Sequence, residues 1–144
     1  MVPAQVQIVR ETFAKVEPIS DQAAALFYGR LFELDPSLRP MFRGDMAEQG
    51  RKLMQTIAVV VHGLDRLATL IPAVEALGRR HAGYGVRDEH YATVAAALLW
   101  TLEQGLGPAF TPAAREAWTA AYTTLASVMQ TAAAEVARPP ARVA

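Results

Sequence analysis

The chain has 144 residues, of which 52% are apolar and 19% are charged, and this composition is typical of one folded globular domain. Fourteen basic and fourteen acidic side chains give a net charge of zero, so no basic excess indicates binding to nucleic acid or to an anionic membrane. Because cysteine is absent, disulfides, thiolate nucleophiles, iron–sulfur clusters and cysteine-ligated zinc sites are excluded.

The sequence predicts neither a targeting segment nor a membrane-spanning segment. Its start, MVPAQVQIVRETF, lacks a basic region followed by an apolar stretch, so we expect no signal peptide. The longest strongly apolar run, TIAVVVHGL, is too short to cross a bilayer, so we expect no membrane insertion. Together with the lack of cysteine, these features favour a cytoplasmic protein.

Apolar residues at helical spacing predict the elements of the first third of the chain. The stripe of the first helix consists of Val6, Val9, Phe13 and Val16. Pro18 ends this helix, and a second helix is expected over residues 20–34. A short helix then starts at Asp35 and Pro36 and ends near Pro40.

The middle of the chain predicts one long and one short helix. Residues 43–50 form a polar link into a helix whose apolar stripe runs to Leu64. Residues 72–80 predict a short helix that begins with a proline. Gly83 and Gly85 follow it and are typical of a helix end.

Two longer helices complete the pattern. Asp88 is placed to cap a helix whose apolar face consists of Tyr91, Val94, Ala95, Leu98 and Leu102. Thr111 caps the last helix, and Pro112 occupies its first position. The apolar stripe of that helix consists of Trp118, Tyr122, Leu125 and Met129.

No stretch alternates in the manner of a β-strand, so the predicted fold class is all-α, with about seven helices, two of them short. Residues 1–137 are expected to form the one domain. Residues 138–144 are expected to form a flexible tail.

His81 is the residue for which the pattern suggests chemistry. The histidines of the chain, His62, His81 and His90, lack the spacing of four residues that places two zinc ligands on one helix face. A single histidine in an apolar pocket suits haem, because the porphyrin supplies four nitrogens and the protein adds one. The alternative is a histidine that only interacts with the dipole at a helix C-terminus.

The two other histidines have simpler interpretations. Nine residues separate His62 from Leu53, which places His62 on the opposite helix face and outside any pocket that Leu53 lines. His90 lies at a helix start, where a structural role is expected.

Several segments together resemble a known family. They are ALFYGRLFELDPSLRPMF, EQGRKLMQ, LIPAVEALGRRHAGYGV, the pair HY at residues 90–91, and AWTAAYTTLASVM. The chain resembles the bacterial single-domain globins and the globin domain of flavohaemoglobins over about residues 6–135. The resemblance implies a globin fold packed around one haem b. The flavohaemoglobin reductase has no counterpart before residue 144, so the chain is similar to the haem half alone.

The resemblance also implies the residues of the haem site. His81 is the expected iron ligand, Phe42 the aromatic residue packed on the haem, and Leu53 the residue that closes the pocket over the gas. The remaining expected contacts are Ile57, Leu77, Val86, Tyr91, Val94 and Leu98. Lys52 and Arg80 are expected to pair with the haem propionates, although ordinary solvated charges are an equal alternative.

Tyr28 and Gln49 match the distal polar pair of the bacterial relatives. Bound O2 carries partial negative charge, and a phenol and an amide can each donate a hydrogen bond worth about 1 kcal/mol to it. The pair therefore predicts tight O2 binding and slow O2 release. Bound CO should be stabilised less by the same hydrogen bonds. Taken singly, a core tyrosine is the more common explanation for Tyr28, and an exposed polar residue in a first helical turn is the more common one for Gln49.

Tyr91 and Glu135 match the tyrosine and glutamate beneath the proximal histidine of flavohaemoglobins. Such a network makes the imidazole more electron-rich and favours activation of O2. The alternative for Glu135, near the end of the chain, is a solvated side chain.

The resemblance implies a haem protein with O2, NO and CO as ligands, and a monomer or homodimer. Conversion of NO to nitrate with bound O2 is the expected activity, and it needs a separate reductase. The alternatives are O2 storage or delivery, gas sensing, a peroxidase-like enzyme, and a haem-free helical interaction module.

Overall fold

The computed structural model describes residues 1–137 and contains six α-helices, four 3-10 helices and no strand within that range. The α-helices are α1 (Pro3–Val16), α2 (Ser20–Leu34), α3 (Met46–His62), α4 (Leu67–Gly83), α5 (Asp88–Leu106) and α6 (Pro112–Ala137). The 3-10 helices are η1 (Glu17–Ile19), η2 (Pro36–Met41), η3 (Leu64–Arg66) and η4 (Gly107–Ala109). The predicted all-α class is confirmed, with six α-helices in place of about seven.

Two predicted helix starts were too late in the sequence. α4 begins at Leu67 and contains Pro72 as an interior residue, where a start at the proline was expected. α3 begins at Met46, inside the expected polar link, because the Asp45 side chain accepts a hydrogen bond from the Ala47 N–H at 2.9 Å. In α3, the polar residues of the first turn give the same pattern as a loop. In α4, Pro72 was read as a first helical position, whereas the helix holds it in its interior.

The cap of α5 also differs from the expected one. His90, not Asp88, provides it: the His90 Nδ1 accepts a hydrogen bond from the Arg87 N–H at 2.9 Å. The predicted cap of α6 is confirmed, since the Thr111 hydroxyl accepts from the Ala114 N–H at 3.1 Å.

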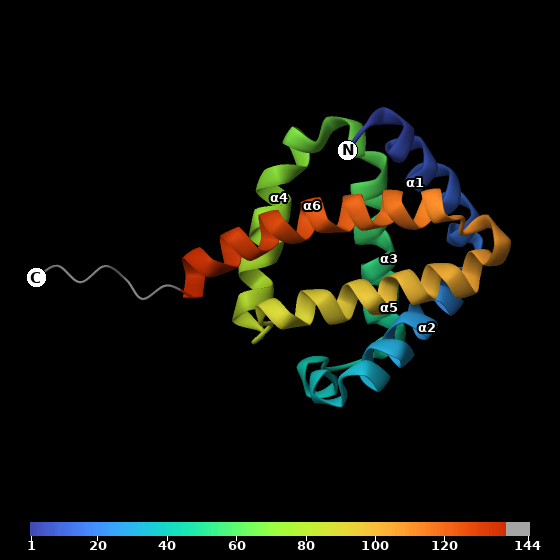
Figure 1. Cartoon of the computed structure of the whole chain (residues 1–144). Helices are drawn as coiled ribbons and strands as arrows, with labels where there is room; N and C mark the ends of the chain where they lie inside the picture. Colours follow the sequence, from blue (N-terminus) through green and yellow to red (C-terminus); the bar gives the residue numbers. More distant parts are fainter. Residues whose placement is uncertain (138–144) are drawn as a thin grey trace, which may run out of the picture.

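The helices form two groups, α1, α4 and α6 in one and α2, α3 and α5 in the other, and the contact between α5 and α6 joins them (Figure 1). α6 packs most extensively against α4 and also against α1, while α2 packs against α5 and α3. Figure 1 shows α3 running across the direction of α5 and α6, with α4 crossing the far end of α6. This arrangement leaves the space between α3, α4, α5 and α6 to be filled by side chains or by a ligand.

Two clusters of buried apolar side chains hold these helices together. The larger joins α1, α3, α5 and α6, with Val9 and Ala117 fully buried in it. The smaller joins α2, η2 and α5 around Leu31 and Ala97. The two clusters flank the candidate site.

Arg10 fixes the end of α3 against α1. Its guanidinium donates hydrogen bonds to the carbonyl oxygens of Val61 at 3.3 Å and His62 at 2.8 Å, and pairs with Asp65 at 2.8 Å. The last carbonyls of a helix have no partner within it, so this contact satisfies two of them.

Within residues 1–137, no single helix is long and apolar enough to cross a membrane. α3 and the segment from η3 to α4 reach that length only together, and they are bent by 59° at the break between them. The expected tail at 138–144 lies outside the described residues, so it stays a prediction.

Candidate functional site

A cavity of about 280 Å³ lies between the helices. Its wall is almost entirely apolar and takes residues from every α-helix and from η2 and η3. Ligand pockets typically have volumes of about 300–1,000 Å³, apolar walls and a few polar groups, so this cavity is the candidate site.

The end of α4 places His81 at this cavity. Gly85 has φ of +92°, and the Val86 N–H donates to the His81 carbonyl at 3.0 Å while the Gly85 N–H donates to the Ala82 carbonyl at 3.1 Å. These two bonds and the left-handed glycine form a Schellman motif, which ends the helix in one defined geometry. The sequence GYGV therefore fixes the backbone of His81.

The His81 ring has a defined tautomer. Its Nδ1 lies 2.8 Å from the Leu77 carbonyl oxygen, one helical turn earlier. A carbonyl only accepts, so Nδ1 carries the proton and Nε2 keeps a free lone pair. Burial lowers the pKa of His81 below its usual value, which keeps the ring neutral at pH 7. A neutral imidazole whose second nitrogen donates to a carbonyl is the usual state of a metal-ligating histidine.

His90 also lines the cavity, and its tautomer is the opposite one. Its Nδ1 accepts from the Arg87 N–H, so the proton is on Nε2. That Nε2 is buried and has no hydrogen-bond partner among residues 1–137, where Asp35 Oδ2 lies 4.0 Å from it. Neither nitrogen of His90 therefore offers a lone pair to a metal.

The other polar groups of the wall are mostly occupied. Trp118 Nε1 donates to the Thr12 hydroxyl at 2.8 Å, and the Tyr122 hydroxyl donates to the Tyr91 carbonyl at 2.7 Å. The Thr56 hydroxyl donates to a carbonyl of its own helix. The Tyr91 hydroxyl is buried without a partner among the described residues. His81 Nε2 is thus the nitrogen lone pair that the wall presents to a ligand.

Tyr28 brings a second free polar group to the wall. It is buried on α2, and its hydroxyl makes no hydrogen bond with a described residue. Its ring contacts those of Phe27 at 5.1 Å, Phe42 at 5.2 Å and Phe32 at 6.1 Å between centroids. Burial raises the pKa of Tyr28 to about 12, so the hydroxyl remains a donor at neutral pH.

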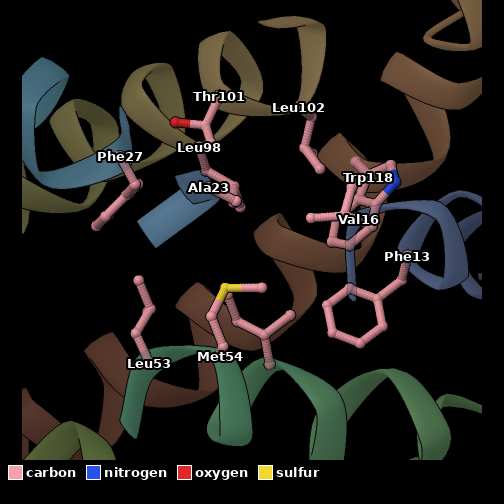
Figure 2. Close-up of a pocket in the computed structure, with 11 residues that line it drawn as sticks. Phe13, Val16, Ala23, Phe27, Leu53, Met54, Leu98, Thr101, Leu102 and Trp118 are labelled. Atoms are coloured by element: carbon pink, nitrogen blue, oxygen red, sulfur yellow. The ribbon is translucent and has the colours of Figure 1, made fainter. Parts of the chain in front are cut away.

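A smaller apolar cavity of about 20 Å³ adjoins the first (Figure 2). Figure 2 shows Leu53 and Met54 on one side of it, and Leu98, Thr101 and Leu102 on the other. The Thr101 hydroxyl donates to the Ala97 carbonyl at 2.8 Å, which leaves no free donor for a water. Leu53, Ile57, Phe27, Leu98 and Trp118 line both spaces.

Most of the predicted site residues meet at the large cavity. The structure places at its wall Tyr28, Phe42, Leu53, Ile57, Leu77, His81, Val86, Tyr91, Val94 and Leu98. His62 is exposed and lies outside the wall, as its helical angle predicts.

Three predicted polar contacts lie outside the wall. Gln49 is half-buried one turn before Leu53 and makes no side-chain hydrogen bond with a described residue. Lys52 is exposed and lies 3.8 Å from Glu48 on the same helix. Arg80 is also exposed.

The expected pairing of Tyr91 with Glu135 is absent. The Glu135 side chain is 64% exposed and its Oε2 lies 3.7 Å from Arg79, while the Tyr91 hydroxyl has no partner among the described residues. α6 places this side chain at the surface, where it faces Arg79 of α4. Glu135 therefore lies away from Tyr91 in this structure, and its role at the site stays a prediction.

Sequence reasoning missed a large part of the wall. It did not assign to the site Val9, Phe27, Leu31, Leu38, Met41, Thr56, Val60, Val61, Leu64, Val74, His90, Trp118, Ala121, Tyr122, Leu125, Ala126 and Met129. The apolar stripe of α6 was recognised as a packing face, and the same stripe would have indicated these α6 residues. His90 had no sequence signal beyond its position before Tyr91.

Comparison with known proteins decides the family. A family model described as Globin matches residues 25–129, well over half of the chain. The chain is a globin. It is 32% identical over 136 residues to neuroglobin of Danio rerio, which covers 85% of this chain and 86% of that protein.

The globin also resembles longer bacterial proteins. It is 35% identical over 126 residues to the flavohemoprotein of Vibrio cholerae, and the alignment covers 85% of this chain and 32% of that protein. The flavohemoprotein of Bacillus subtilis gives 29% identity over 126 residues. The chain thus spans about a third of the length of these relatives.

Two solved structures have the same fold. A bacterial globin from Campylobacter jejuni superposes with a TM-score of 0.82 at 25% identity, over 94% of this chain and 99% of that one. The second is an engineered carbene transferase, derived from a candidate nitric oxide dioxygenase of Rhodothermus marinus. It superposes with a TM-score of 0.86 at 28% identity, over 95% of this chain and 96% of that one. The predicted globin fold is confirmed.

The residues of the cavity fit the haem that globins generally bind. A neutral imidazole supplies one nitrogen lone pair, and the flat porphyrin needs one protein ligand and apolar contact on both faces. Among the described residues no three His, Cys, Asp or Glu side chains gather into a metal-ligating group, so a lone histidine here suits a cofactor that brings its own ligands.

Proposed function

We propose that this globin binds haem b through His81 Nε2 and holds O2 reversibly in the large cavity. The single observation that carries the proposal is the tautomer of His81, because its bond to Leu77 leaves Nε2 free at the wall of an apolar cavity. When bound, haem supplies the iron at which diatomic gases bind.

The chain's own residues orient the iron ligand, keep water out of the cavity and offer a hydrogen bond to the gas. The Schellman turn and the Leu77 carbonyl hold the His81 ring in one orientation. Phe42, Leu53 and Ile57 exclude water from the cavity. A dry environment strengthens the electrostatic attraction between a donor and a partly negative gas.

Tyr28 is the proposed donor to that gas. Its unpaired, protonated hydroxyl lies in the wall, and bound O2 carries more negative charge than CO. We assign Gln49 a weaker, second role, because its side chain lies outside the wall. Tight O2 binding with slow release follows from this arrangement.

Conversion of NO to nitrate is the finer proposal. In this reaction NO and O2 would combine to nitrate with uptake of one electron from a separate reductase, while His81 would hold the haem and Tyr28 would donate a hydrogen bond to O2. The support comes from the flavohemoprotein relatives and from the Rhodothermus marinus protein. The exposed position of Glu135 weakens it, because no carboxylate supports Tyr91 among the described residues. Reversible O2 binding is therefore the primary proposal.

The test compares wild type with Tyr28→Phe after reconstitution with haem. Loss of one hydrogen bond of about 1.4 kcal/mol should raise the O2 dissociation rate constant about tenfold, with a smaller effect on CO. Phe32→Leu is a matched control, since Phe32 contacts the Tyr28 ring but lies outside the cavity wall. Equal O2 dissociation rates in wild type and Tyr28→Phe would contradict the role of Tyr28.

The same proteins test the finer proposal. NO is added to the oxygenated protein, nitrate is measured, and turnover is followed with an added flavin reductase. Stoichiometric nitrate with sustained turnover supports dioxygenation. Failure of haem to bind in any condition would instead favour the haem-free helical module.

A further inference from the structure

α4 and α6 touch backbone to backbone at Gly78. Gly78 is buried, and a Cβ atom built on it would lie 2.4 Å from the Met129 carbonyl oxygen and 2.6 Å from the Met129 Cα. Because both atoms belong to the backbone, no side-chain rotation relieves the contact. The two helices therefore approach to a distance that only glycine permits.

This contact lies one helical turn before the proposed iron ligand. Leu77, the neighbour of Gly78, supplies the carbonyl that holds His81 Nδ1 at 2.8 Å. Leu77, His81 and Met129 all line the large cavity. Since a helix moves as a stiff body, the spacing between α4 and α6 at Gly78 is transmitted to His81 within a single turn.

The size of the expected displacement follows from the contact. An ordinary Cβ contact needs at least 3.4 Å, and the present one would be 2.4 Å, so α4 must retreat from α6 by about 1 Å to accept a methyl group. Metal–ligand distances tolerate deviations of about 0.2 Å. A helix shift of this size is therefore large for an iron ligand and small for a helical fold.

We propose that Gly78 is a positioning residue for the haem ligand: it sets how far His81 reaches into the cavity by letting α4 rest on the backbone of α6. This inference rests on the proposed haem function. Gly78 touches neither gas nor haem in this account and acts only through the position of His81.

Gly83 provides a matched control in the same helix. It lies two residues after His81, and a Cβ atom built on it meets nothing within 4 Å. Gly83→Ala therefore makes the same chemical change near the same ligand without the contact. The change from glycine to alanine raises the helix propensity by the same amount at both positions.

The experiment reconstitutes wild type, Gly78→Ala and Gly83→Ala with haem. The iron–histidine stretching band of the reduced protein is recorded by resonance Raman spectroscopy, and haem loss to an excess of a scavenger is timed. Gly78→Ala should shift the band and lose haem about tenfold faster or more, in the range seen when support of a metal ligand is removed. Gly83→Ala should match wild type in both.

A second pair of variants separates positioning from general disruption. In a His81→Gly background, free imidazole supplies the iron ligand without a link to α4, and Gly78→Ala should then leave the iron–imidazole band unchanged. A shift that persists with free imidazole would overturn the proposal.

The remaining outcomes are also decisive. Loss of the helical circular dichroism signal in Gly78→Ala would overturn the proposal, because Gly78 would then serve the fold and not the ligand. If both wild type and Gly78→Ala take up haem and show the same iron–histidine stretching band, this inference is overturned and the proposed function is not. A wild-type protein that takes up no haem overturns the proposed function and this inference with it.

Discussion

Two histidines in the same cavity wall differ in which ring nitrogen carries the proton. The partner of Nδ1 decides this: a carbonyl for His81 and an N–H for His90. Proximity to the cavity does not separate the two residues, since both line it. The hydrogen-bond partner therefore identifies His81 as the residue that can ligate iron, and it assigns His90 to the start of α5.

The pH dependence of Tyr28 gives a residue-scale prediction. Its pKa is raised from 10.0 to about 12, so the hydroxyl should donate to O2 without change between pH 7 and 10 and fail only near pH 12. The stability that this shift contributes is likewise complete below pH 10 and is lost as the pH rises through about 12. Stopped-flow O2 release after pH jumps checks this, with Tyr28→Phe as the variant that lacks the transition. An inflection well below pH 10 that Tyr28→Phe removes would contradict it.

A prediction for Glu135 concerns the missing proximal network. Because the side chain is 64% exposed and faces Arg79, Glu135→Gln should leave the iron–histidine stretching band unchanged and alter the free energy of unfolding by less than about 0.5 kcal/mol. Resonance Raman spectroscopy and urea denaturation measure the two quantities. A clear downward shift of the band in Glu135→Gln would show that the carboxylate does act on His81.

The apolar part of the site was predictable from sequence, and the charged part was not. Leu53 and Val94 reach the cavity because helical spacing fixes their direction, whereas Phe42 follows η2 in an extended conformation and was expected from the resemblance alone. Glu135 and Lys52 have long side chains near helix surfaces, where a solvated position or a neighbouring charge determines the outcome. The hydrogen bonds that set the tautomers of His81 and His90 are local, to residues four and three positions earlier, but the sequence does not show which ring nitrogen takes part in them.

The end of α4 is the element on which the proposed site depends. Gly85 adopts φ of +92°, and the two bonds of the Schellman motif close around the backbone of His81 and Ala82. Gly83, by contrast, is an ordinary helical residue. The sequence predicted a helix end at this glycine pair, and the structure shows that the second glycine makes it.

Gly85→Ala should weaken this element. A side chain in the left-handed region costs about 1–2 kcal/mol, so the free energy of unfolding should fall by that amount. Gly83→Ala is the control for the same exchange at a helical position. Thermal or urea unfolding of the apoprotein measures both, and equal stability of the two variants would contradict the assignment of the turn.

Element existence was more predictable than element boundaries. Every long helix was expected from its apolar period, because that period reflects the face each helix buries. α4 extends five residues before the expected start at Pro72, since its first turn has no capping side chain to mark it. The cap of α5 was misplaced because a histidine ring, not the usual acidic side chain, accepts the N–H.

At the scale of the whole molecule, two apolar clusters flank one cavity. The cavity wall draws on all six α-helices of residues 1–137, so a ligand bound there contacts the entire fold. Any ligand that binds only the folded state adds stability, by about 4 kcal/mol at a concentration 1,000 times its dissociation constant. Haem binding is therefore expected to rigidify the molecule as a unit.

The central claim is that His81 binds haem iron in this cavity. The most direct measurement is a titration of apoprotein with hemin, followed by ultraviolet–visible spectra of the ferric, reduced and O2-bound forms. It compares wild type with His81→Ala, His90→Ala and the exposed control His62→Ala. We expect a stable oxygenated spectrum in wild type and His62→Ala. The histidine-ligated spectrum should be retained in His90→Ala and lost in His81→Ala alone. No porphyrin complex in wild type, or loss in His90→Ala with retention in His81→Ala, would contradict it.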